Sequence, residues 1–125
     1  MIGTIKVDGL NADSISFLSA LVRGTDEGKA VSISTDNTVA IAADGGVIFG
    51  KVHVIDKADA VATVQSEGYA ELAYTGDAPT VGAYQALVGN GTGGVKIVAS
   101  PAVGDKHFDI ISVDTDNGLV VFKLG

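Results

Sequence analysis

Gly89, Gly91 and Gly94 have the spacing of a dinucleotide-binding fingerprint. In that motif the glycine loop lies between a strand and a helix, because the amino terminus of the helix binds the pyrophosphate. The residues that follow here, 95–98, read Val-Lys-Ile-Val, which is typical of a strand. The pattern therefore predicts a glycine-rich hairpin loop and no cofactor.

The other residues that could do chemistry have no partner at a useful spacing. Residues 114–118, Asp-Thr-Asp-Asn-Gly, resemble a calcium loop, but the acids are out of register with the glycine and no glutamate closes the loop. His53 and His107 lie in expected strands without a Cys or carboxylate at ligand spacing, which favours solvent-facing positions. Glu67 and Glu71 have no identifiable nucleophile or base beside them. We expect no catalytic residue, no metal site and no enzyme activity.

Composition narrows the classes of partner. The 125 residues carry 15 Asp and Glu against 8 Lys and Arg, a formal net charge of −7, which disfavours binding to nucleic acid. The absence of Cys excludes disulfides and thiol catalysis. The sequence has no apolar run long enough to span a bilayer and no recognisable export signal at its start, so no membrane association is expected.

Short apolar and β-branched runs alternate with Gly, Asp and Asn turns from residue 28 onward, and this pattern predicts strands. The connections are too short for crossover helices, so neighbouring strands should pair antiparallel. Asn117-Gly118 is the strongest hairpin signal. We expect an all-β fold, a single antiparallel β-sandwich or small β-barrel. The expected strands are residues 29–34, 38–42, 47–55, 60–66, 69–74, 83–88, 95–99, 107–113 and 119–124.

Residues 1–27 differ in pattern from the rest, which predicts an N-terminal arm followed by a β domain over residues 28–125. The stretch 11–23 is ambiguous. Ser14 could begin a helix with Ile15 and Leu18 on one face, but Ser14-Ile15-Ser16-Phe17 also alternates as a strand does. The extended alternative is favoured, because a single short helix in a β protein needs its own packing partner.

The core must be aliphatic, since aromatic residues make up 6% of the chain and Trp is absent. Such strands bury little area each, so association between copies would add stability. Tyr69, Tyr74 and Tyr84 cluster in the sequence and are candidates for an oligomer interface, because Tyr offers a large contact area at little entropic cost. Packing in the core is an equally good use for them.

Five runs of this sequence resemble the small capsid decoration, or cement, proteins of tailed bacteriophages. They lie within residues 28–96, a stretch of roughly half the chain or a little more: GKAVSI at 28–33, NTVAIA at 37–42, IFGKV at 48–52, ATVQSEGYAEL at 62–72 and YTGDAPTVG at 74–82. The first 27 residues and the C-terminal hairpin do not match this family closely.

The resemblance implies a β-rich, non-catalytic homotrimer that is made in the host cytoplasm and binds the major capsid protein on the outside of the head. The N-terminal arm is then the candidate for gripping the capsid, with contact residues Ile2, Ile5, Val7, Leu10, Ile15 and Phe17. The rival interpretation is a ligand-binding or adhesion module for carbohydrate or a host surface. The scarcity of aromatic residues, which sugars commonly need for stacking, speaks against it.

Overall fold

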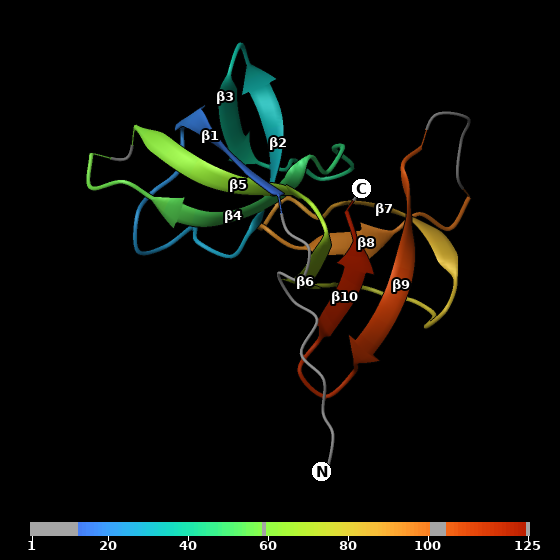
Figure 1. Ribbon diagram of the computed structural model, residues 1–125. Coiled ribbons are helices and arrows are strands. Elements are labelled where there is room, and N and C mark those ends of the chain that lie inside the picture. The colour runs from blue at the N-terminus through green and yellow to red at the C-terminus, as the bar shows by residue number, and fades with distance from the viewer. Residues whose placement is uncertain (1–12, 59, 101–104, 125) are drawn as a thin grey trace.

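The computed structural model describes residues 13–58, 60–100 and 105–124, and within these ranges the protein is all-β. Ten strands form two sheets, which lie side by side in Figure 1. The first sheet is a closed five-stranded barrel and the second is an open five-stranded sheet. The predicted all-β fold is confirmed.

The barrel consists of the first five strands in the order β1-β3-β2-β4-β5. They are β1 (Asp13–Ser19), β2 (Ala30–Thr35), β3 (Thr38–Ile41), β4 (Gly50–Ile55) and β5 (Val61–Glu67). Inward-pointing side chains of β2 to β5, together with Leu21 after β1, form an aliphatic cluster of Leu21, Val31, Val39, Val52, Ile55, Ala62 and Val64. The pairs within the barrel are antiparallel except for β1 and β3, which run parallel and join at Leu18–Thr38 and Ser19–Val39.

The second sheet has the order β6-β10-β9-β7-β8. Its strands are β6 (Tyr69–Ala73), β7 (Tyr84–Gly89), β8 (Val95–Ile97), β9 (His107–Asp114) and β10 (Leu119–Lys123). Its inner face holds Phe108 and Phe122, whose rings meet edge to face at 4.9 Å. A parallel bridge between Tyr74 and Val95 links the end of β6 to β8, so the two edges of the sheet approach each other there.

A second cluster, distinct from the barrel cluster, is shared by the two sheets, and we call it the shared core. Ala30, Ala42 and Ile48, which come from the first half of the chain, pack in the same cluster as Phe108 and Phe122. Backbone bonds cross the junction, since Gly45 N–H donates to the Gly89 carbonyl oxygen at 2.9 Å and Gly89 N–H donates to the Gly46 carbonyl oxygen at 2.9 Å. A Cβ on Gly89 would lie 2.7 Å from the Cβ of Ala42, so this close approach requires glycine.

The segment expected to be an arm supplies part of the barrel. β1 pairs with β5 from Asp13 to Leu18, and Phe17 and Leu21 contribute to the barrel cluster. The favoured extended conformation is therefore the one observed at residues 13–19. The predicted boundary at residue 28 runs through the barrel, and residues 1–12 lie outside the described ranges.

One expected strand begins later than predicted. The run 47–55 is a strand only from Gly50, because Ile48 turns into the shared core while Val47 stays exposed. A Cβ on Gly50 would collide with the Gln65 carbonyl oxygen, so β4 can start beside β5 only at a glycine.

The Asn117-Gly118 hairpin joins β9 and β10 as predicted, with Gly118 at a φ of +66°.

Candidate interaction surfaces

The glycine motif is a hairpin loop between the antiparallel strands β7 and β8, as predicted. The Asn90 side chain holds this loop, because its Oδ1 accepts the N–H groups of Thr92 at 2.9 Å and Gly94 at 3.0 Å. A Cβ on Gly94 would lie 2.6 Å from the Ala73 carbonyl oxygen. Gly94 therefore allows close packing of the turn against β6, whereas Gly89 and Gly91 approach Ala42 and Asp44.

The acidic loop 114–118 is an Asx turn. Asp114 Oδ1 accepts the N–H of Asp116 at 3.1 Å and of Asn117 at 3.2 Å, and its Oδ2 accepts the Asn117 side-chain amide at 2.8 Å. The hydrogen bonds from Asn117, side chain first and backbone next, hold the pKa of the Asp114 carboxyl below its usual range. Both carboxylate oxygens are thus engaged in the turn.

His53 is exposed, as expected, but it has a partner that the sequence did not reveal. Its Nε2 lies 2.6 Å from Oε1 of Gln65, which is fully buried. The Gln65 Nε2 donates to the carbonyl oxygens of Glu67 at 2.9 Å and Tyr69 at 2.8 Å, so Oε1 is the acceptor and His53 donates. His53 therefore completes a hydrogen-bond network at the turn from the barrel to the second sheet.

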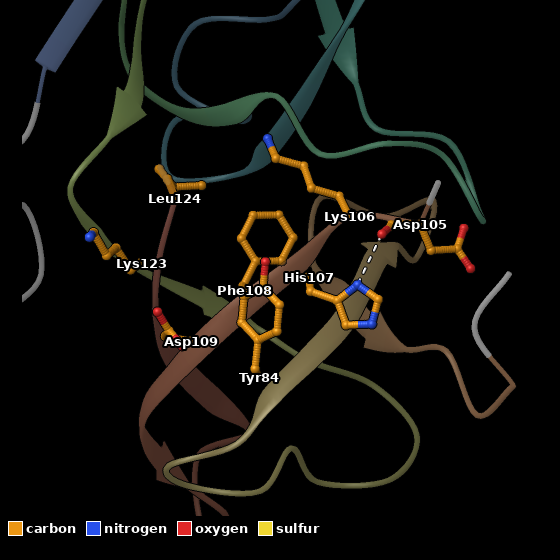
Figure 2. A pocket seen from close by; sticks show the side chains of 8 residues that line it. All are labelled: Tyr84, Asp105, Lys106, His107, Phe108, Asp109, Lys123 and Leu124. Atoms are coloured by element: carbon orange, nitrogen blue, oxygen red, sulfur yellow. Dashed lines mark hydrogen bonds between the residues drawn. The ribbon is translucent and has the colours of Figure 1, made fainter. Parts of the chain in front are cut away.

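His107 is half-buried rather than solvent-facing, because it stacks on Tyr84. The two rings lie 5.2 Å apart at an interplanar angle of 25°. His107 Nδ1 lies 3.0 Å from the Asp105 carbonyl oxygen, which can only accept, so Nδ1 carries the proton and the ring orientation is fixed. Both residues line a hollow of about 450 Å³, shown in Figure 2, together with Asp105, Lys106, Phe108, Asp109, Lys123 and Leu124.

Lys106 lies between this hollow and a smaller apolar hollow beside Ile33 and Val47. Its ammonium donates to the Ile48 carbonyl oxygen at 3.2 Å and lies 5.2 Å from the centre of the Phe108 ring. Burial lowers the pKa of Lys106. These contacts anchor the start of β9 to the barrel half of the molecule.

The three tyrosines do not form one cluster. Tyr74 packs against the shared core. Tyr69 and Tyr84 point to the outer face of the second sheet, because each alternates with an inward neighbour along its strand. They lie on strands separated by β10 and β9.

The expected capsid-contact residues divide into three groups. Ile2, Ile5, Val7 and Leu10 lie outside the described residues. Phe17 is half-buried in the barrel, where its ring meets that of Phe49 at 5.3 Å and 87°. Ile15 is half-exposed at the start of β1.

The structure adds a surface that the sequence analysis missed. Leu18, Val54 and Val61 expose 55%, 59% and 39% of their area on the outside of the barrel. Leu18 and Val61 are directly paired across β1 and β5, and Val54 pairs with Thr63 on the same face. We call Leu18, Val54 and Val61 the barrel patch. Alternation in β5 gave a clue to Val61, but only the pairing brings the three together.

Among the described residues, no three His, Asp or Glu side chains gather as metal ligands do. The part of the chain that the structure describes holds no helix long and apolar enough to cross a membrane. No protein-family model matches the chain, and no curated protein matches it.

Proposed function

We propose that this protein is a capsid decoration protein of a tailed bacteriophage, a homotrimer that binds the outside of the head and stabilises the junctions between capsomers. The observation that carries the proposal is the barrel patch: three large aliphatic side chains stand exposed on adjacent strands of a small domain. Apolar side chains gathered on one face are typical of a protein contact surface.

The shape of the barrel supports contact through side chains. A closed barrel has no free edge onto which a partner strand could pair, so the affinity of its outer face must come from the side chains on it. The runs that resemble the decoration proteins also fall largely on strands β2 to β6. Leu18, Val54 and Val61 themselves lie outside these runs, so the resemblance and the barrel patch are independent observations.

The proposal includes a physical account of the cementing. Packaged DNA presses outward on the shell and strains the contacts between capsomers. A subunit that binds across such a contact adds interface area, and it stabilises the assembled state because it binds that state and not the separated capsomers. A chain with a net charge of −7 has few cations to offer, so its attachment should depend on apolar contact and respond little to moderate salt.

Head binding tests the function. Undecorated heads of the phage whose genome encodes this chain would be mixed with the wild-type protein and sedimented. Bound wild-type protein should raise the temperature at which filled heads lose their DNA. If heads with confirmed occupancy lose DNA at the same temperature as bare heads, the cementing function is wrong.

Substitution tests the barrel patch. Leu18→Lys should weaken binding to heads at least tenfold, because burying a leucine side chain contributes about 1.5–3 kcal/mol. Val81→Lys is the matched control, since Val81 is equally exposed but lies in the loop before β7. Equal loss of binding in both variants would show a general charge effect and would remove the patch from the proposal. Light scattering of the free protein tests the trimer.

A further inference from the structure

The outer face of the second sheet carries a row of polar and aromatic side chains. Tyr84 on β7 pairs directly with Asp109 on β9, and Lys123 on β10 pairs directly with Tyr69 on β6. Because Phe122 pairs with Ile110, the same register places Lys123 beside Asp109. Four neighbouring strands thus present Tyr84, Asp109, Lys123 and Tyr69 in order, and we call these residues the outer row.

Tyr84 has one ring face available for a ligand. His107 covers the other face at 5.2 Å, yet Tyr84 still exposes 67% of its area. In Figure 2 it lies between Asp109 on one side and His107 on the other. Since His107 is tied to the Asp105 backbone, the pair forms a rigid aromatic platform at the edge of the 450 Å³ hollow.

The chemistry beside the platform is suited to hydroxyl groups. The Asp109 carboxylate accepts hydrogen bonds and the Lys123 ammonium donates them, and both line the hollow. A ring that stacks on one face through its C–H groups and carries hydroxyls at its rim matches such a site. Sugars have this combination.

The charge around the hollow does not favour anionic ligands. Asp105 and Asp109 line it and are balanced by Lys106 and Lys123, so it has no excess of positive charge, and the whole chain carries a net charge of −7. A stacked nucleotide would bring phosphates close to these carboxylates. The ligand that fits is therefore uncharged.

The length of the row indicates an oligosaccharide rather than a single sugar. Three inter-strand steps of about 4.8 Å separate Tyr84 from Tyr69, a span of about 14 Å. The scarcity of aromatic residues argues less strongly against sugar binding once two of the three tyrosines share this face. The charged centre of the row is also unlike the core of a subunit interface, where charged residues are depleted.

From these observations we infer that the outer row, together with His107, binds a neutral oligosaccharide. This activity is additional to head binding and does not depend on it. A decoration protein with such a face would hold the head through one surface and a glycan through another.

The test uses the isolated wild-type protein on an array of neutral oligosaccharides of three or more sugars, from gluco-, galacto-, manno- and N-acetylglucosamine series, followed by titration of the best binder. Wild type should bind at least one member. Tyr84→Ala should weaken that binding about tenfold, a loss of about 1.4 kcal/mol, which is near the upper end for an aromatic contact. Tyr84→Phe retains the ring and should bind within about threefold of wild type, and Val81→Ala should bind as wild type does.

Three results would overturn the inference. One is that no neutral oligosaccharide binds, or that anionic glycans alone bind and are released by salt. Another is that Tyr84→Ala binds as tightly as wild type while circular dichroism shows both to be folded. The third is that Tyr84→Ala changes the oligomeric state in light scattering, which would assign this face to contacts between copies.

Discussion

Replacing Gln65 with leucine should destabilise the fold strongly, because Gln65 is a buried polar residue whose side chain is fully hydrogen-bonded. Gln65 is fully buried at the end of β5, where the chain passes from the barrel to the second sheet. Its side-chain amide donates to two carbonyl oxygens, those of Glu67 and Tyr69, and accepts from His53. Leucine has a similar size and none of these bonds, so the substitution isolates the hydrogen bonding.

The magnitude follows from the groups left without a partner. A buried polar group that loses its hydrogen bond costs about 1–3 kcal/mol. Two carbonyl oxygens lose their donor here, and the apolar leucine recovers part of the loss by burial, so we expect the free energy of unfolding to fall by about 2–4 kcal/mol. His53→Ala should cost less than about 1 kcal/mol, because water can reach the exposed position of His53 and donate in its place.

Urea unfolding followed by circular dichroism measures the effect. With a slope of about 2 kcal/mol per molar urea, the middle of the usual range, the midpoint of Gln65→Leu should fall by roughly 1–2 M. Gln85→Leu is the matched control, since Gln85 Oε1 accepts a single bond from Thr80 N–H at an exposed site. A fall of less than about 0.5 kcal/mol for Gln65→Leu, or one no larger than the control, would refute the reasoning.

Three further outcomes are expected. Gly118→Val should lower the free energy of unfolding by about 1–2 kcal/mol or more, because a φ of +66° strains a β-branched residue. Gly118→Asn should lower it by less, and equal urea midpoints for the two variants would contradict this. The pKa of Asp26 is lowered, first by the hydrogen bond that its carboxylate accepts from Val22 N–H at 2.8 Å and then by Lys29. The contribution of the Asp26 carboxylate to the free energy of unfolding is therefore complete above about pH 4 and is lost as the pH falls through the lowered pKa. Wild type should therefore lose more stability on acidification than Asp26→Asn, and parallel melting curves across pH would count against the assignment. Removing residues 1–27 should unfold the barrel, because β1 and Leu21 go with them; retained ellipticity and a cooperative melt would show otherwise.

Strands bounded by local turn signals could be predicted from the sequence almost to the residue. Residues 38–42, 69–74 and 119–124 were expected, and β3, β6 and β10 start where predicted and end one residue earlier. Each follows a turn whose chemistry lies in the sequence itself, such as Asn37 at a φ of +53° or Gly68 at +83°. The start of β4 was not predictable in this way, since it depends on the distant contacts of Ile48 and Gly50.

Pairing between strands distant in sequence was the part that local pattern could not supply. The parallel pair β1–β3 closes the barrel, and no short-range signal marks it. The same limit applies to the surfaces. Alternation along a strand shows which residues of that strand share a face with Tyr84 or with Asp109. Only the β7–β9 register shows that Tyr84 and Asp109 lie side by side. His53 reaches Gln65 because of the register of β4 on β5, with a bulge between Val52 and Val54.

The two surfaces differ in chemistry, and this difference separates their partners. Among the described strands, those of the barrel close on themselves, and the Tyr74–Val95 bridge draws the edges of the second sheet together, so backbone pairing offers little to a partner. The barrel patch is aliphatic, whereas the outer row is charged at its centre and aromatic at its ends. Apolar contact is insensitive to moderate salt and suits a permanent hold on a capsid, while stacking and hydroxyl bonds suit a weaker and exchangeable ligand. Leu18→Lys should therefore weaken head binding at least tenfold and leave glycan binding unchanged, and Tyr84→Ala should weaken glycan binding about tenfold and leave head binding unchanged. Loss of both activities in either variant would mean that one surface serves both.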